Sequence, residues 1–312
     1  MRQFLRPLVA FFLISNFAGA YLAQSAGRAL DSDAAVVALP EGQAWSAPVP
    51  SPDGRSLALT SPSFRGISLL DTQTGEVLRL TDQEGAGFRP AWSADSRSLA
   101  YRAALGGARR KKLIAVGHTD GVVESASPLL DSVSVPLWRG LQLIYFLAGR
   151  ERPEMRNLGP AEAEDAPSTA LPAASPGGRL FLVAPDGKTT DATIPGKVLF
   201  LPVLSGDGKQ FVAECLDGHL YLGSTEGGPL TDLGPGSWPS FARDDTSLLF
   251  ERTTDDGHAV TSSQLFLMDL RTRQAVPITA EKEIVARHPA LAGDGHTLYF
   301  DAAGAIYRGW LP

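Results

Sequence analysis

Short apolar stretches alternate with polar turns along most of this 312-residue chain, and the alternation recurs as one unit. Each unit opens with a proline and a short strand, continues through a polar turn such as Asp-Gly, and ends in a second apolar strand. Units of this kind begin at Pro48, Pro90, Pro136, Pro202, Pro239 and Pro289, with spacings of 42, 46, 66, 37 and 50 residues. A strand-rich repeat of about 40 to 50 residues is typical of a β-propeller, in which each repeat forms one blade.

Each unit continues into a third strand, and all but the last continue into a fourth. The third strands, such as residues 67–70 and 113–116, are nearly continuous apolar runs, as expected for strands covered on both faces. The last unit has no fourth strand, and the apolar residues 35–39 form an unpaired candidate near the other end of the chain. We therefore predict an all-β fold over residues 34–312. It would be a six-bladed β-propeller of four-stranded antiparallel blades, closed by this N-terminal strand.

The unit at Pro136 departs from the others because residues 149–178 precede its predicted third strand at 180–183. This segment contains five prolines and the acidic run 161–165. Its composition predicts a mobile, disordered-like loop. The loop could be a tolerated surface insertion or a segment that docks a partner, and the sequence leaves both open.

The first twenty residues have the pattern of a cleavable signal peptide. Arg2 and Arg6 precede a short apolar run at 8–14, and Ala18-Gly-Ala20 offers a small-residue cleavage site. The run is shorter than the roughly twenty residues needed to span a bilayer, although an uncleaved anchor is the alternative. We expect cleavage near Ala20, a short tail at 21–33, and a periplasmic or secreted protein whose membrane association is only indirect.

Composition and motifs narrow the function. The chain carries 28 Lys and Arg against 34 Asp and Glu, a net charge of −6, which argues against nucleic acid as a partner. It contains no Gly-x-Ser-x-Gly, no His-Glu-x-x-His, no paired-cysteine zinc spacing and no phosphate-binding loop. The sequence therefore predicts no catalytic residues, no metal and no cofactor.

Residues just before each opening proline should lie where the innermost strand meets the central channel: Ala47, Arg89, Val135, Leu201, Trp238 and His288. Among these and their neighbours, Arg89, Trp238, Arg287 and His288 are the predicted ligand- or partner-binding residues. Together they would make a shallow polar pocket with aromatic character, which suits a peptide carboxylate or a glycan. Ordinary water-filled channel lining is the alternative.

The repeat also resembles a known family. Pro90-Ala-Trp-Ser-Ala-Asp-Ser96, preceded by Leu80-Thr81, is similar to the TolB-type propeller repeat, and the resemblance covers residues 34–312. It implies a six-bladed propeller that makes protein–protein contacts in the periplasm. The α/β domain that precedes the TolB propeller is not matched. The same repeat occurs in propellers of prolyl-peptidase-type hydrolases and of secreted lyases.

These observations favour a non-catalytic propeller of the bacterial envelope, a TolB-like interaction scaffold that acts as a monomer. Its partner would be an envelope or periplasmic protein or peptide, bound at the channel mouth or through residues 149–178. Two alternatives remain. One is a secreted polysaccharide lyase with His288 as base and Arg89 as charge neutraliser, and the other is a carbohydrate-binding propeller.

Overall fold

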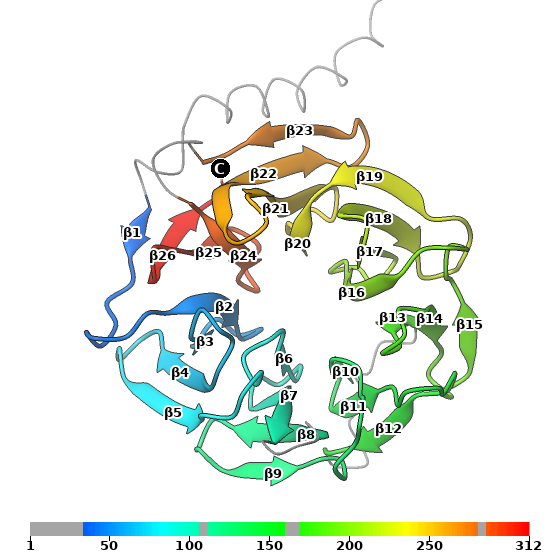
Figure 1. The fold of residues 1–312 in the computed structure, drawn as a ribbon, viewed down its shortest axis with the longest axis horizontal. Helices are drawn as coiled ribbons and strands as arrows, with labels where there is room; N and C mark the ends of the chain where they lie inside the picture. Colours follow the sequence, from blue (N-terminus) through cyan, green and yellow to red (C-terminus); the bar gives the residue numbers. More distant parts are fainter. Residues whose placement is uncertain (1–33, 106–110, 160–168, 280–284, 312) are drawn as a thin grey trace, which may run out of the picture.

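The strands form a ring of seven small antiparallel sheets around a central axis (Figure 1). The computed structural model describes residues 34–105, 111–159, 169–279 and 285–311, and within these ranges it contains strands β1 to β26 and no helix. The protein is therefore an all-β propeller with seven blades. No described segment is a helix long and apolar enough to cross a membrane. The expected signal peptide (1–20) and tail (21–33) lie outside the described residues.

The blades follow one another in chain order, and in each the first strand lies nearest the axis (Figure 1). Blade 1 contains β2 (Ser46–Pro50), β3 (Ser56–Thr60), β4 (Ile67–Asp71) and β5 (Val77–Thr81), and blade 2 contains β6 (Ala91–Trp92), β7 (Ser98–Leu105), β8 (Lys111–His118) and β9 (Val123–Ser125). Blade 3 contains β10 (Leu137–Arg139), β11 (Gln142–Tyr145) and β12 (Glu154–Asn157), and blade 4 contains β13 (Leu171–Ala174), β14 (Leu180–Val183) and β15 (Thr189–Asp191).

The remaining blades each have four strands. Blade 5 contains β16 (Leu199–Leu204), β17 (Gln210–Cys215), β18 (His219–Ser224) and β19 (Thr231–Pro235). Blade 6 contains β20 (Ser237–Phe241), β21 (Ser247–Asp255), β22 (Val260–Asp269) and β23 (Gln274–Pro277). Blade 7 contains β24 (Arg287–Leu291), β25 (Thr297–Ala302), β26 (Ala305–Trp310) and, on its outer edge, β1 (Ala35–Val36).

The prediction of six blades is wrong, because residues 149–178 do not form one loop. Their described parts contain β12, which ends blade 3, and β13, which begins blade 4. The turn after β13 is built like the turn of blade 1: the Gly178 N–H donates to the Ser175 carbonyl, as Gly54 does to Ser51. Both glycines have positive φ, which glycine adopts without a steric penalty. An additional unit therefore opens at Pro172.

Apolar clusters fill the space between neighbouring blades, one at each of the seven junctions. The second and third strands of the blades supply most of these side chains. Because both faces of these strands pack against neighbouring blades, their sequences are nearly continuously apolar. The junction between blades 3 and 4 is small, and there Phe146 stacks on Phe181 with ring centroids 5.3 Å apart. Hydrophobic packing thus ties the unforeseen blade into the ring.

The predicted N-terminal strand does complete the last blade. In β1, Ala35 pairs with Arg308 and Val36 with Tyr307 of β26, in antiparallel register. The Val37 N–H extends the ladder by donating to the Ile306 carbonyl at 2.8 Å. The two ends of the described chain are therefore joined in one blade.

Replacing Val37 with proline should loosen this closure, because proline has no N–H to donate to Ile306. We expect the free energy of unfolding, measured by urea denaturation, to fall by about 1–3 kcal/mol. Val36→Pro is the matched control. Antiparallel strands bond at alternate residues, so the Val36 N–H faces away from β26 and a proline there is tolerated. Equal losses in the two variants would contradict a closing role for this ladder.

Candidate functional site in the central channel

The innermost strands carry a repeated backbone distortion where they meet the channel. In five blades the residue before the opening proline has a left-handed φ of about 50°: Ala47, Arg89, Leu201, Trp238 and His288. In blades 1, 5, 6 and 7 the pairing of the first two strands shifts register at this point, as in a β-bulge. A left-handed conformation costs a non-glycine residue about 1–2 kcal/mol. Bulges often redirect a side chain beside a functional site.

Buried carboxylates hold three of these distorted residues in place. They follow the opening prolines of blades 5, 6 and 7 by twelve residues, in the second strands: Glu214, Glu251 and Asp301. Each accepts a hydrogen bond from the backbone N–H of the distorted residue in the next blade, at 3.2 Å for Trp238, 2.5 Å for His288 and 3.0 Å for Ala47. Charge-assisted hydrogen bonds of this kind are strong, and here they offset part of the backbone strain.

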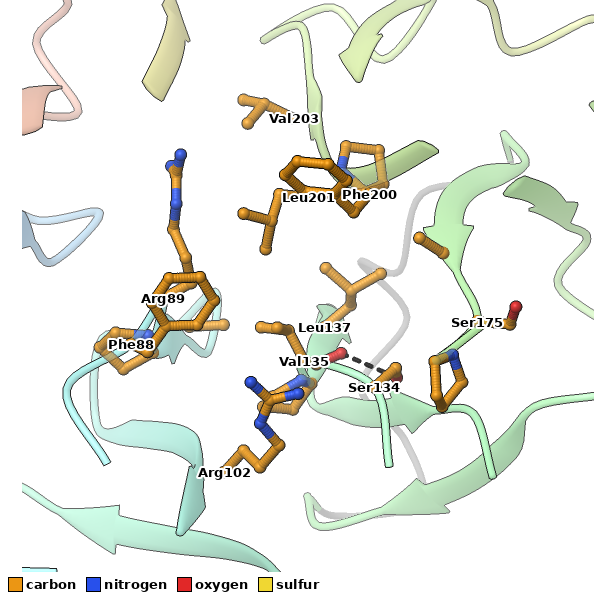
Figure 2. Close-up of a pocket in the computed structure, with 16 residues that line it drawn as sticks. Phe88, Arg89, Arg102, Ser134, Val135, Leu137, Ser175, Phe200, Leu201 and Val203 are labelled. Carbon is orange, nitrogen blue, oxygen red and sulfur yellow. Dashed lines mark hydrogen bonds between the residues drawn. The ribbon is translucent and has the colours of Figure 1, made fainter. Parts of the chain in front are cut away.

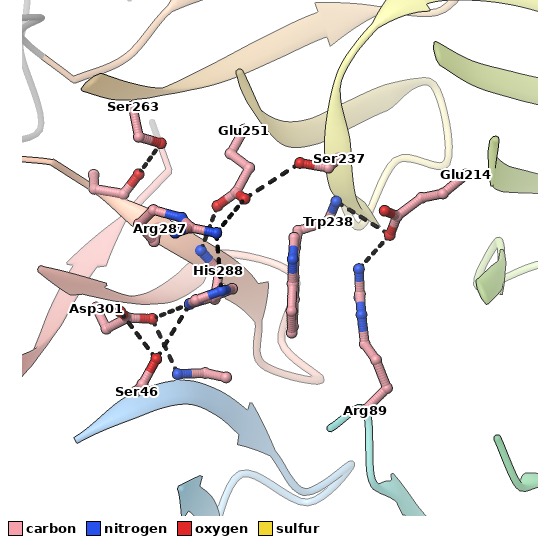
Figure 3. A network of polar contacts seen from close by, with 12 residues as sticks. Ser46, Arg89, Glu214, Ser237, Trp238, Glu251, Ser263, Arg287, His288 and Asp301 are labelled. Atoms are coloured by element: carbon pink, nitrogen blue, oxygen red, sulfur yellow. Dashed lines mark hydrogen bonds and ion pairs between the residues drawn. The ribbon is translucent and has the colours of Figure 1, made fainter. Parts of the chain in front are cut away.

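Arg89 crosses the channel from blade 2 to reach the carboxylate of blade 5. Its guanidinium forms an ion pair with Glu214 and lies over the ring of Trp238, 3.5 Å from the ring centroid (Figure 3). The Nε of Arg89 is buried and has no hydrogen-bond partner among the described residues. The arginine is thus held by one carboxylate and by a cation–π contact.

Arg287 and His288 occupy the other side of the same network. His288 is 6% exposed, and its Nδ1 lies 2.6 Å from Oδ1 of Asp301 (Figure 3). The Arg287 guanidinium lies 3.6 Å from Glu251 and 3.4 Å from His288 Nε2. Both ring nitrogens of the histidine are therefore occupied. Its ring also packs edge-on against Trp238, with centroids 4.3 Å apart.

Burial shifts the pKa of three charged groups in this network. It raises the pKa of Glu214, an effect opposed chiefly by the positive charge of Arg89. It likewise raises the pKa of Glu251, against the charges of His288 and Arg287. The pKa of Arg89 is lowered by burial in spite of Glu214 and Glu251. The charges are therefore tolerated because they are paired, and removing one partner should be costly.

The structure thus brings the four predicted site residues together, and their role in binding remains a prediction. Arg89, Trp238, Arg287 and His288 pack on one another and on the buried acids, and of the four only Arg89 borders the cavity described below. The acids that organise them were not among the predicted residues. The signal that could have found them is the acid that recurs twelve residues after Pro202, Pro239 and Pro289.

A cavity of about 380 Å³ opens in the channel beside this network, between blades 2, 3, 4 and 5 (Figure 2). Its wall is mainly apolar, with Val135, Leu137, Leu201 and Val203 among the lining residues. Arg89 runs along one side of the cavity (Figure 2), and Trp238 lies between Arg89 and His288 (Figure 3). Ligand pockets in proteins typically measure about 300–1,000 Å³, so the cavity is large enough for a small ligand or a short chain segment.

Arg102 is the second charged residue in the wall, and its place in the repeat is informative. It follows Pro90 by twelve residues, so blade 2 has a cation where blades 5, 6 and 7 have a buried acid. The half-buried guanidinium donates from Nη1 to the Val133 carbonyl at 3.2 Å. No carboxylate of the described residues is seen to pair with it, and burial lowers its pKa. The position is therefore suited to bind an anion.

No group of three or more His, Cys, Asp or Glu side chains within the described ranges is arranged to hold a metal ion. The wall of the cavity combines an apolar surface with the Arg102 guanidinium. Sequence reasoning missed Arg102, although its position twelve residues after Pro90 marks it as the charge-reversed member of the series.

Comparison with known proteins supports the fold. No family model matches the chain, and no curated protein matches it in sequence. Among solved structures, TolB from Acinetobacter baumannii is 18% identical with a TM-score of 0.51, covering 75% of this chain and 54% of that one. This chain therefore spans about half the length of that TolB. The TolB resemblance is a weak structural match that extends to the propeller fold.

Other propellers are similar to a comparable degree. An oligogalacturonate lyase from Vibrio parahaemolyticus is 13% identical with a TM-score of 0.50, covering 88% of this chain and 79% of that one. The WD40 repeats of RRP9 are 13% identical with a TM-score of 0.63, covering 91% and 99%. At these identities the likeness concerns the fold alone, and function has to be argued from the site.

Proposed function

We propose that this protein is a non-catalytic binding propeller of the bacterial envelope, which takes a protein or peptide segment in its central channel. The observation that carries the proposal is the open cavity between blades 2 and 5. In its largely apolar wall lies Arg102, a cation that shows no carboxylate partner among the residues the structure describes. Apolar pockets with a few well-placed polar groups are the usual form of a binding site. The export pattern in residues 1–20 supports the envelope location.

His288 and Arg89, the residues that the lyase alternative would use, already bind other side chains of the protein. This supports a binding role over catalysis. His288 is buried, with Nδ1 on Asp301 and Nε2 beside Arg287, while Arg89 is paired with Glu214. A general base must lie within hydrogen-bonding reach of its substrate. A net charge of −6 also disfavours a polyanionic polysaccharide. We therefore rank the lyase and carbohydrate-binding alternatives below peptide binding.

Panning a displayed random-peptide library on the purified protein tests the proposal. We expect enriched peptides whose affinity, measured by fluorescence polarisation, falls about tenfold or more in Val203→Trp, because the larger side chain fills the cavity. Leu216→Trp is the matched control. Leu216 directly follows β17 of the same blade, but it is 74% exposed and does not line the cavity.

Two results would contradict the proposal. One is a library that yields no binding peptide, and the other is a set of peptides that bind Val203→Trp as tightly as the unaltered protein. A separate assay follows the absorbance of the unsaturated product during incubation with oligogalacturonate. Turnover that is lost on changing His288 would favour the lyase alternative instead.

A further inference from the structure

The charge of the cavity wall restricts the ligand. Its charged lining residues are Arg89 and Arg102. Arg89 is neutralised by its ion pair with Glu214, whereas Arg102 contacts a backbone carbonyl and shows no carboxylate partner within the described chain. The wall therefore presents one uncompensated positive charge, at Arg102.

The two serine side chains of the wall already make hydrogen bonds within the protein. The Ser134 hydroxyl donates to the Val135 carbonyl at 3.0 Å and accepts from the Phe146 N–H at 2.9 Å. The Ser175 hydroxyl accepts from the Arg179 N–H at 3.2 Å. Among the side chains of the wall, the Arg102 guanidinium therefore offers the N–H donors that remain for a ligand, since one of its nitrogens bonds to the Val133 carbonyl. The cavity therefore favours an apolar group with its polar atoms gathered at one end.

Arg102 is placed to receive that end. One of its nitrogens donates to the Val133 carbonyl. The guanidinium forms part of the cavity lining, beside Val135 (Figure 2). A guanidinium carries several N–H donors in a planar fork, and the fork matches the two oxygens of a carboxylate. Phe88, whose ring centroid lies 5.9 Å from the Arg102 guanidinium carbon, closes one side.

We infer that the cavity binds a carboxylate attached to a short apolar group, with Arg102 as the carboxylate-binding residue. This inference rests on the proposed function, because it takes the channel cavity to be the binding site. One uncompensated charge suits a monoanion better than a phosphate dianion, and the acidic chain as a whole repels multiply charged ligands. The carboxylate could be the C-terminus of a peptide or belong to a free carboxylic acid.

Two peptide arrays and a set of free acids distinguish these sources. The first array presents pentapeptides with free C-terminal carboxylates, whose last two positions run through all apolar residues, and the second presents the same peptides as amides. Octanoate and phenylacetate, each with its neutral amide, represent free acids. Binding is measured by calorimetry for the unaltered protein, for Arg102→Gln and for Arg97→Gln. Arg97 is the control because it is an exposed arginine in the turn of the same blade.

We expect peptides with a free carboxylate to bind at least about tenfold more tightly than their amides, and this preference to vanish in Arg102→Gln but not in Arg97→Gln. Thermal melting of Arg102→Gln verifies that the variant is folded. If free acids bind through Arg102 and no peptide does, the carboxylate inference stands and the proposed peptide-binding function fails. If amides bind as tightly as carboxylates, or Arg102→Gln binds normally, the inference is overturned while peptide binding can stand. Absence of any binding overturns both.

Discussion

Replacing Glu251 with alanine should lower the free energy of unfolding by about 3–5 kcal/mol. The Glu251 carboxylate is 1% exposed and accepts hydrogen bonds from the His288 N–H and the Ser237 hydroxyl, while Arg287 lies 3.6 Å away. Its removal leaves a partly buried cation and a strained N–H without their acceptor. The loss should therefore exceed that of an ordinary surface acid several-fold.

Urea denaturation followed by tryptophan fluorescence measures this loss. Glu226→Ala serves as control, because Glu226 is an exposed acid outside the channel network. Glu251→Gln keeps an oxygen acceptor but removes the charge. A loss of stability between those of Glu251→Ala and Glu226→Ala would separate the contribution of the charge from that of the hydrogen-bond acceptor. A Glu251→Ala variant as stable as Glu226→Ala would show that this carboxylate does not hold the channel together.

Arg89→Met should produce a loss of similar size at neutral pH, but one that shrinks as the pH falls. Without Arg89, the Glu214 carboxylate keeps the burial that raises its pKa and loses the charge that opposes it. An acid whose pKa is higher in the folded than in the unfolded state binds its proton more tightly when folded, so stability falls as the pH rises above 4.5, the ordinary value for this group. The variant should therefore approach the unaltered protein in stability as the pH falls towards that value.

The double variant Arg89→Met with Glu214→Gln tests the pairing directly. Replacing both members of a buried ion pair by neutral groups of similar size is often nearly neutral, whereas removing one is strongly destabilising. We expect the double variant to recover most of the loss and to show no extra dependence on pH relative to the unaltered protein. Additive losses, measured by denaturation at several pH values, would contradict a coupled pair.

The strand pattern was predictable from the sequence, whereas the number of blades was not. Alternating apolar runs predicted the strands, and the missing fourth strand of the last unit predicted the pairing of β1 with β26. The unit at Pro172 escaped notice because Gly177 replaces the aspartate that marks the turn in most other units. Its turn keeps the backbone hydrogen bonds from Ser175 and Gly178 that match those from Ser51 and Gly54 in blade 1, but it lacks the aspartate side chain. The sequence therefore predicts the strand at 180–183 as the third of one blade, whereas it is the second of the next.

The channel site was predictable only in part. Counting back from the opening prolines located Arg89, Trp238 and His288, because every first strand meets the channel at the same point of the repeat. The partners of these residues depend on which blades face one another, and that depends on the number of blades. With six blades assumed, the contact between Arg89 of blade 2 and Glu214 of blade 5 could not be foreseen.

The closure of blade 7 has a mechanical consequence. Because β1 runs antiparallel to β26, with Ala35 opposite Arg308, residues 34 and 311 lie towards the same end of this strand pair. A pull on these two residues therefore peels the pair apart one hydrogen bond after another, instead of shearing all of them at once. Under tension the ring should yield first at this strand pair, while the load bypasses the other six blades.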